Sequence, residues 1–279
     1  MINKKIAIIG VGHIGQAVTA GLLRGKAVSG KNLLLISPHL DKLSKFKKEY
    51  GVRITKNNRE AAEFADILLI AVRPRIVRRV IEEIRDDIRK ETLIISMAAC
   101  VTLELLTNYF RKDSLKIIRI MPNLPVVYGL GVVGWIGNKR IKENDKKLFE
   151  RLLGPLGLLV ACRDEASLDR LSMISGCGPG IVGYFMDNLE RAAKDSGFSP
   201  KLAERIIRAT FHGTIHHLKA TKISPQELVS SVATKGGITE KVLRNLDKRG
   251  FYHNLSKSIK KGYDKIGKIT KELENGYLR

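Results

Sequence analysis

The most informative segment of this chain is Ile6-Ala7-Ile8-Ile9-Gly10-Val11-Gly12-His13-Ile14-Gly15. Its apolar first part has the length and composition of a buried strand, and the pattern Gly10-x-Gly12-x-x-Gly15 follows at once. Gly10 allows a tight turn, Gly12 lets a pyrophosphate approach the backbone, and Gly15 lets the next helix pack closely on the strand. The N-terminus of that helix offers unpaired N–H groups and a partial positive charge to phosphates.

The surroundings of this glycine pattern predict dinucleotide binding. Residues 16–24 are typical of a helix, and residues 32–37 contain a second apolar strand. Strand, glycine turn, helix and strand form the unit that binds dinucleotides. His13 and Ile14 open the helix, so we include both among the cofactor-binding residues. The alternative is a glycine turn in an α/β protein that binds another ligand.

The composition indicates a globular protein of two domains or one large domain. The chain has 279 residues, of which 44% are hydrophobic. No apolar stretch is long enough to cross a membrane, so we expect no membrane association. Cys100, Cys162 and Cys177 are far apart and lack the spacing of metal ligands, so we expect no metal site. Sparse cysteines also favour a reducing, cytoplasmic setting.

The net charge of +22 does not indicate a specific nucleic-acid site, because the basic residues are spread along the chain. In the densest run, residues 257–268, lysines alternate with Ile259, Tyr263 and Ile266, as on an amphipathic helix with one solvated face. Basic residues are not interleaved with aromatic ones as in RNA-binding modules. We therefore expect the charge to attract anionic substrates and cofactors.

Short apolar runs alternate with helical segments up to about residue 163, which predicts an α/β fold with a parallel sheet covered on both faces. The expected strands are residues 6–9, 33–36, 67–71, 93–96, 116–120, 132–135 and 158–161. The expected helices after the first are residues 41–50, 75–88, 103–109 and 143–153. Beyond residue 164 only helices are expected. We therefore predict a Rossmann domain over residues 1–163 and a helical domain over residues 164–279.

The end of the second strand favours NADP(H) over NAD(H). NAD-binding units usually place a carboxylate there to hold the ribose 2′-hydroxyl, whereas this strand ends Ile36-Ser37-Pro38-His39. A hydroxyl such as that of Ser37 suits a 2′-phosphate better than an acid does, and Asn58 can approach the same ribose. The alternative is that Ser37 only caps the helix that follows.

Three segments follow predicted strands at the edge where an open α/β sheet binds its ligand. They are Ala71-Val72-Arg73-Pro74, Ser96-Met97-Ala98-Ala99 and Met121-Pro122-Asn123-Leu124-Pro125. The small side chains of Ala98 and Ala99 leave room for a nicotinamide, and two prolines fix the backbone while Asn123 keeps a free amide. The alternative is a set of turns that only shape the sheet edge.

Two further segments in the helical half suit a ligand. Small residues in Ser175-Gly176-Cys177-Gly178-Pro179-Gly180 permit the close approach of a ligand or of another helix. In Thr234-Lys235-Gly236-Gly237-Ile238-Thr239-Glu240, two glycines precede a helix, so successive N–H groups can hold a carboxylate. The Thr239 hydroxyl can donate and accept a hydrogen bond. A plain helix cap is the alternative for this segment.

Taken together, these segments resemble the pyrroline-5-carboxylate reductase family over nearly the whole chain. The matching segments occur in the family's order: the glycine turn; Ala71-Val72-Arg73-Pro74 for Val-Lys-Pro; Ser96-Met97-Ala98-Ala99; Met121-Pro122-Asn123-Leu124-Pro125 for Met-Pro-Asn-Thr-Pro; Ser175-Gly176-Cys177-Gly178-Pro179 for Ser-Gly-Ser-Gly-Pro; and Gly236-Gly237-Ile238-Thr239 for Gly-Gly-x-Thr. The ordered set is more specific than any single segment.

The resemblance implies a Rossmann domain followed by a helical domain that intertwines two subunits, often within a ring of dimers. It implies an NAD(P)H-dependent oxidoreductase that reduces a small cyclic imino acid, 1-pyrroline-5-carboxylate, to L-proline. On this basis Gly236, Gly237 and Thr239 hold the substrate carboxylate, and the Thr239 hydroxyl faces the ring nitrogen as the catalytic group. Cys177 belongs to the substrate-binding residues.

Six positions depart from the family pattern on the inferred substrate side, whereas the cofactor side keeps the pattern better. They are Leu124, Cys177, Gly180-Ile181 in place of Ala-Tyr, and Thr234-Lys235 in place of Ser-Pro. Two alternatives therefore stay open besides the reductase. One is an oxidoreductase that acts on another imine or carbonyl, and the other is an inactive NADP-binding regulatory relative.

Overall fold

The computed structural model describes residues 1–277 of the chain. Contacts within the chain divide it into two compact units. Unit 1 comprises residues 1–179 and the chain from Gly262 onward, and unit 2 comprises Gly180–Lys261. The sheet and all the strands belong to unit 1, whereas unit 2 is helical.

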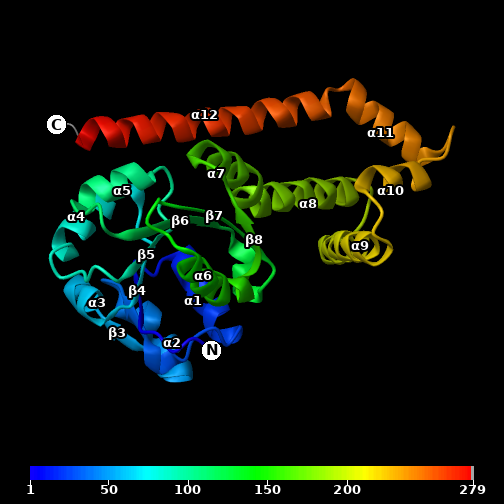
Figure 1. Cartoon of the computed structure of the whole chain (residues 1–279). Helices are drawn as coiled ribbons and strands as arrows, with labels where there is room; N and C mark the ends of the chain where they lie inside the picture. The colour runs from blue at the N-terminus through cyan, green and yellow to red at the C-terminus, as the bar shows by residue number, and fades with distance from the viewer. Residues whose placement is uncertain (278–279) are drawn as a thin grey trace. The chain divides into compact units, whose positions relative to one another are not determined.

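Unit 1 is built on one eight-stranded sheet with the order β3-β2-β1-β4-β5-β6-β7-β8 (Figure 1). The strands are β1 Ile6–Ile9, β2 Leu33–Ile36, β3 Arg53–Thr55, β4 Ile67–Ile70, β5 Leu93–Ser96, β6 Lys116–Pro122, β7 Gly131–Gly137 and β8 Gly157–Ala161. The first six strands run parallel, and the order changes direction on either side of β1. Such a reversal marks the switch point where open α/β sheets bind ligands.

The predicted parallel sheet has one antiparallel pair of strands, near its far edge. β7 pairs antiparallel with β6, with Ile120 opposite Trp135, and β8 runs parallel to β7. Residues 123–130 connect β6 to β7, and this link is too short for the crossover that a parallel neighbour requires. The apolar runs alone do not reveal the strand direction, but the length of this connection does.

Helices cover both faces of the sheet, as predicted, and each face has its own core. In unit 1 the helices are α1 His13–Arg24, α2 Ser44–Tyr50, α3 Asn58–Phe64, α4 Pro74–Ile84, α5 Leu103–Phe110, α6 Glu143–Leu153 and α7 Glu165–Leu171. Val18, Leu22 and Phe149 of α1 and α6 lie in one core cluster. Val77 and Leu106 of α4 and α5 lie in the other. The central strands are buried on both faces, which explains their unbroken apolar sequences.

Short elements account for most differences from the expected pattern. β3 and α3 were not expected, because a three-residue strand with the exposed Arg53 gives no apolar run. A 3₁₀ turn, Leu40–Leu43, replaces the first part of the helix predicted over residues 41–50. α4 ends at Ile84 and not at residue 88.

The strands end at Ala161, close to the predicted domain boundary, but unit 1 continues further along the chain. α7, a π-helical turn at Ser172–Gly176 and the C-terminal part of α12 belong to it. Leu273 of α12 packs against the core of unit 1, and Arg78 donates a hydrogen bond of 3.2 Å to the Gly276 carbonyl. The last helix therefore has one end anchored in unit 1.

Unit 2 consists of most of α8 Gly178–Asp195, α9 Pro200–Thr221, α10 Pro225–Val232, α11 Ile238–Lys248 and the start of α12 Phe251–Tyr277. Only Ala203 and Ile207 are buried among its residues. Large apolar side chains are exposed along its helices and at Phe198 between α8 and α9; those on the helices are Val182, Tyr184, Leu189, Leu202, Ile215, Val229, Val232, Ile238, Val242, Leu246, Phe251 and Tyr252. Over residues 1–277, no helix combines the length and the apolar character needed to cross a membrane.

Candidate functional site

Gly10 and Gly15 shape the turn after β1 and leave no room for side chains. Gly10 has a φ of +91°, which side-chain-bearing residues rarely adopt. A Cβ on Gly10 would lie 2.8 Å from the Val72 nitrogen, and one on Gly15 would lie 2.8 Å from the Gly10 carbonyl oxygen. Gly10 therefore lets the turn pack against the segment after β4, and Gly15 lets α1 pack against the turn.

Gly12 is different, because its backbone is extended and the space beside it is open. It is the N-cap of α1 with φ −79° and ψ −159°, which any residue can adopt, and a Cβ there would have no neighbour within 4 Å. The first backbone hydrogen bond of the helix runs from the Gln16 N–H to the Gly12 carbonyl, at 2.8 Å. The N-terminus of α1 thus presents N–H groups to an open space, and this arrangement fits a pyrophosphate.

The end of β2 carries no carboxylate, and Ser37 has a local structural task there. Ser37 is buried, and its Oγ accepts a hydrogen bond of 3.1 Å from the His39 N–H. Its own N–H donates to the Thr55 carbonyl at 3.2 Å. Asn58 begins α3 and donates a side-chain hydrogen bond of 2.6 Å to Glu83. The cofactor-binding roles of Ser37 and Asn58 stay predictions.

The structure brings the predicted segments after β1, β4 and β5 to one edge of the sheet. The Ala71 N–H donates to the Ile9 carbonyl at 2.8 Å, and the Met97 N–H donates to the Ile70 carbonyl at 2.8 Å. Val72 touches the glycine turn, and Arg73 is exposed at the N-cap of α4. His13 is exposed and Ile14 is half-buried at the head of α1. Ala98 lies within the core, whereas Ala99 is half-buried beside it.

The expectation of a free amide on Asn123 is wrong. Asn123 is buried, its Nδ2 donates to the Ser175 carbonyl at 3.0 Å, and its Oδ1 accepts from the Val132 N–H at 2.8 Å. The side chain thus ties the β6–β7 connection to the π-helical turn before Cys177. Its partners lie 9 and 52 residues away along the chain, so a local motif cannot reveal them. The cofactor-binding role of Asn123 stays a prediction.

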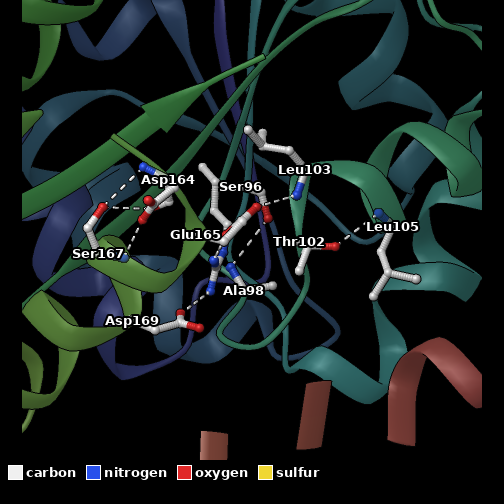
Figure 2. Close-up of polar contacts among 10 residues, drawn as sticks. Ser96, Ala98, Thr102, Leu103, Leu105, Asp164, Glu165, Ser167 and Asp169 are labelled. Atoms are coloured by element: carbon white, nitrogen blue, oxygen red, sulfur yellow. Dashed lines mark hydrogen bonds and ion pairs between the residues drawn. The ribbon is translucent and has the colours of Figure 1, made fainter. Parts of the chain in front are cut away.

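A buried charge cluster, which none of the sequence motifs predicts, links β6 to α7 and α5 (Figure 2). Arg119 of β6 is 1% exposed and forms ion pairs with Glu165 and, at 3.0 Å, with Asp169. Glu165 also accepts the Leu103 N–H of α5 at 2.7 Å. An arginine in the middle of an apolar strand, followed at a distance by two acids on one helix face, is the only sequence signal.

The cysteines differ in their surroundings. Burial, and then the negative charge of Asp169, raise the pKa of the Cys100 thiol, and burial raises the pKa of Cys162. Both thiols are therefore protonated near neutral pH and are poor nucleophiles. Cys177 is exposed where the π-helical turn ends, and its N–H donates to the Ser172 carbonyl at 3.2 Å. Its substrate-binding role stays a prediction.

The glycine pair of unit 2 forms a tight turn before α11, as predicted. Gly236 has a φ of +78°, and Gly237 is the N-cap of the helix. The Gly237 N–H donates to the Thr234 carbonyl at 2.8 Å, and the Gly236 N–H donates to Glu240 Oε2 at 2.6 Å. Thr239 is exposed in the first turn of α11. Their roles toward a substrate stay predictions.

The sheet with its switch point at β1 and the open glycine turn at Gly12 define a Rossmann dinucleotide-binding protein. Residues 5–100 match the family NADP oxidoreductase coenzyme F420-dependent, and residues 165–269 match the family pyrroline-5-carboxylate reductase dimerisation. Pyrroline-5-carboxylate reductase 3 of Danio rerio is 33% identical over 88% of this chain and 85% of its own. The chain therefore belongs to the pyrroline-5-carboxylate reductase family.

Other relatives extend the similarity to almost the full length. Pyrroline-5-carboxylate reductase of Aquifex aeolicus is 29% identical over 96% of this chain and 98% of its own. A solved structure of Plasmodium falciparum pyrroline carboxylate reductase with NADP bound has a TM-score of 0.86 and 26% identity, covering 95% of this chain and 98% of that one. The reductase of Coxiella burnetii gives a TM-score of 0.83 at 28% identity, with 98% and 99% of the two chains covered.

Proposed function

We propose that this chain reduces 1-pyrroline-5-carboxylate to L-proline with NADPH. The observation that carries the proposal is that relatives named for this reductase match the chain almost from end to end, through both the glycine turn of unit 1 and the glycine pair of unit 2. The reaction adds a hydride to the imine carbon and a proton to the ring nitrogen. An oxidoreductase of another imine or carbonyl stays the alternative.

The residues of unit 1 fit NADP(H). The head of α1 and the open space at Gly12 suit the pyrophosphate, and the absence of a carboxylate after β2 suits a 2′-phosphate. Half-buried Ala71, Val72 and Ala99 would flank the nicotinamide at the ends of β4 and β5. When bound, NADPH supplies the hydride.

Side chains need to contribute little to the chemical step beyond positioning, because a protonated imine is already electrophilic. The turn at Gly236 would hold the substrate carboxylate, and the Thr239 hydroxyl would face the ring nitrogen and fix its orientation. Positioning of this kind contributes roughly 7–11 kcal/mol to lowering a barrier. A catalytic lysine or histidine is therefore not required.

We also propose that the working form is a homodimer or a ring of dimers in the cytoplasm. Unit 2 buries two side chains and exposes a row of large apolar ones, which is unfavourable in water for an isolated chain. A second copy of the chain is the partner suggested by the dimerisation family that residues 165–269 match. The three free thiols suit a reducing compartment.

Oxidation of NADPH, followed by absorbance with 1-pyrroline-5-carboxylate as substrate, tests the function. We expect turnover with proline as the product and a higher kcat/KM with NADPH than with NADH. Turnover only with a different imine or carbonyl would replace the proposed substrate. Binding of NADPH in calorimetry without turnover of any imino acid would make the chain an inactive, regulatory relative.

A further inference from the structure

The turn that is expected to hold the substrate carboxylate already holds a carboxylate of the chain itself. The Gly236 N–H donates to Glu240 Oε2 at 2.6 Å. The other oxygen, Oε1, lies 2.8 Å from the guanidinium of Arg244, one helical turn further on. The Glu240 side chain is 22% exposed, although the residues around it in unit 2 are mostly exposed. Glu240 is thus held at both oxygens.

This contact is not an ordinary capping box. In a capping box, the acid at the third helical position accepts the N–H of the N-cap residue. Here the N-cap is Gly237, and its N–H is used by the Thr234 carbonyl, so Glu240 reaches one residue further back. α10 has the ordinary arrangement, in which Glu227 accepts the N–H of its N-cap Ser224 at 2.6 Å.

The two glycine N–H groups of the turn therefore differ in how readily a ligand can bind them. The Gly237 N–H is fixed by a backbone carbonyl, and only a change of the turn would free it. The Gly236 N–H is held by a side chain, which can rotate away. Arg244 is 70% exposed and can keep its ion pair with Glu240 after such a rotation, so the displaced carboxylate would stay partnered.

We propose that Glu240 is a specificity-determining residue that competes with the substrate carboxylate for the Gly236 N–H. The proposal rests on the proposed function, because it assumes that the turn at Gly236 binds that carboxylate. A carboxylate-bearing imine must displace Glu240 and enter beside its negative charge. When only a fraction of the molecules has the site open, the apparent affinity for the substrate is the intrinsic affinity multiplied by that fraction.

Glu240 would compete only with the carboxylate of the substrate. Two substrates that differ only in this carboxylate therefore separate the competition from other effects on KM. One is 1-pyrroline-5-carboxylate, and the other is 1-pyrroline, the same cyclic imine without the carboxylate. Glu240→Gln keeps the size of the side chain and removes its charge. We expect the KM for 1-pyrroline-5-carboxylate to fall about tenfold in this variant, with less than about a twofold change in the KM for 1-pyrroline. We expect Glu240→Ala, which also removes the acceptor, to show at least the same fall.

Glu227→Gln is the matched control, because it neutralises a helix-capping carboxylate with the same 2.6 Å contact outside the glycine turn. It should leave the ratio of the two KM values unchanged, and thermal unfolding of all variants separates loss of a cap from loss of competition. An unchanged ratio or a higher KM for 1-pyrroline-5-carboxylate in both Glu240 variants would overturn the inference. A wild-type enzyme without activity on 1-pyrroline-5-carboxylate would instead refute the proposed function.

Discussion

Two glycines in the turn after β1 have opposite sensitivities to substitution, although both belong to one motif. A side chain on Gly15 would collide with the Gly10 carbonyl, 2.8 Å from its Cβ, whereas one on Gly12 would meet only open space. The physical reason is that Gly15 serves packing within the protein. The space beside Gly12 is open within the protein, and we propose that the pyrophosphate occupies it.

We therefore expect Gly12→Val to fold normally and to lose NADPH binding, because the added methyl groups occupy the space of the pyrophosphate. Titration calorimetry measures the affinity, and circular dichroism confirms the fold. Gly154→Val is the control, since a Cβ on Gly154 also has no neighbour within 4 Å but lies in the 3₁₀ turn before β8. Wild-type affinity in Gly12→Val would remove this turn from the cofactor site.

Thr239 is the residue on which the proposed chemistry depends most. Thr239→Ala keeps the backbone N–H at the start of α11 and removes only the hydroxyl. We expect kcat for 1-pyrroline-5-carboxylate to fall by roughly ten- to a thousandfold with a smaller change in KM. Thr239→Ser should retain most of the rate, and Thr239→Val, which has the same shape without the polarity, should not. Wild-type kcat in a folded Thr239→Ala would show that the hydroxyl has no chemical role.

Local motifs predicted the positions of these residues but not their partners. Sequence order placed Gly12 at a helix head and Gly236 before another helix, and the structure agrees. It could not show that Asn123 binds Ser175 or that Glu240 reaches back to Gly236, since both depend on which rotamer a side chain adopts in the folded chain. Hydrogen bonds between side chains and distant backbone are therefore the part of the site that only the structure provides.

Among the elements, β6 and α7 are joined by a charge cluster whose cation is almost fully buried. Arg119 is 1% exposed, and its partners Glu165 and Asp169 are 31% and 17% exposed. Arg119→Met would leave two carboxylates side by side without a cation. We expect a loss of about 3–5 kcal/mol in the free energy of unfolding, measured with urea.

Arg59→Met is the control for this prediction. Arg59 is 69% exposed and lies 3.9 Å from Asp87, so its loss should cost less than about 1 kcal/mol. Equal losses in the two variants would mean that burial does not set the strength of the Arg119 cluster.

The N-terminus of α7 should also make stability depend on pH. Asp164 caps this helix, and hydrogen bonds from the Ser167 N–H and hydroxyl lower the pKa of its carboxyl. A group with a lowered folded-state pKa stabilises the protein above its unfolded-state pKa, and that contribution is lost as the pH falls through the folded-state value. Asp164→Asn caps the helix without titrating. The stability advantage of the wild type over this variant should therefore shrink as the pH falls below about 4, the ordinary pKa of an aspartate, in urea unfolding, whereas a constant difference would contradict the assignment.

At the level of elements, the strands formed by buried apolar runs were predicted well. The short strand β3 and the antiparallel direction of β7 were not predicted. β1, β2 and β5 have the expected bounds, because four consecutive buried residues between helices leave little choice. β3 is short and partly exposed, and only its pairing with β2 makes it a strand. The direction of β7 is set by the connection before it and is invisible in its own residues.

For the molecule as a whole, the proposed assembly rests on the contrast between the two units. Unit 1 has a complete core on each face of its sheet. Unit 2 exposes large apolar side chains along all its helices and has two buried residues. An exposed apolar surface of this extent marks an interaction surface in a soluble protein. The helical pattern predicted the helices, but exposure of their apolar faces could be seen only in the folded chain.

We expect the wild-type protein to have at least twice the chain mass of 31.1 kDa in light scattering coupled to size exclusion. Ile215 of α9 is 63% exposed, and Ile215→Asp would place a charge in the surface that we propose a second copy covers, so this variant should dissociate. His217→Asp, about 200° around the same helix, introduces the same charge on another face and should stay assembled. A wild-type protein that is monomeric at micromolar concentration would contradict the proposed assembly. Dissociation of both variants alike would mean that added charge on α9, and not the apolar face at Ile215, breaks the assembly.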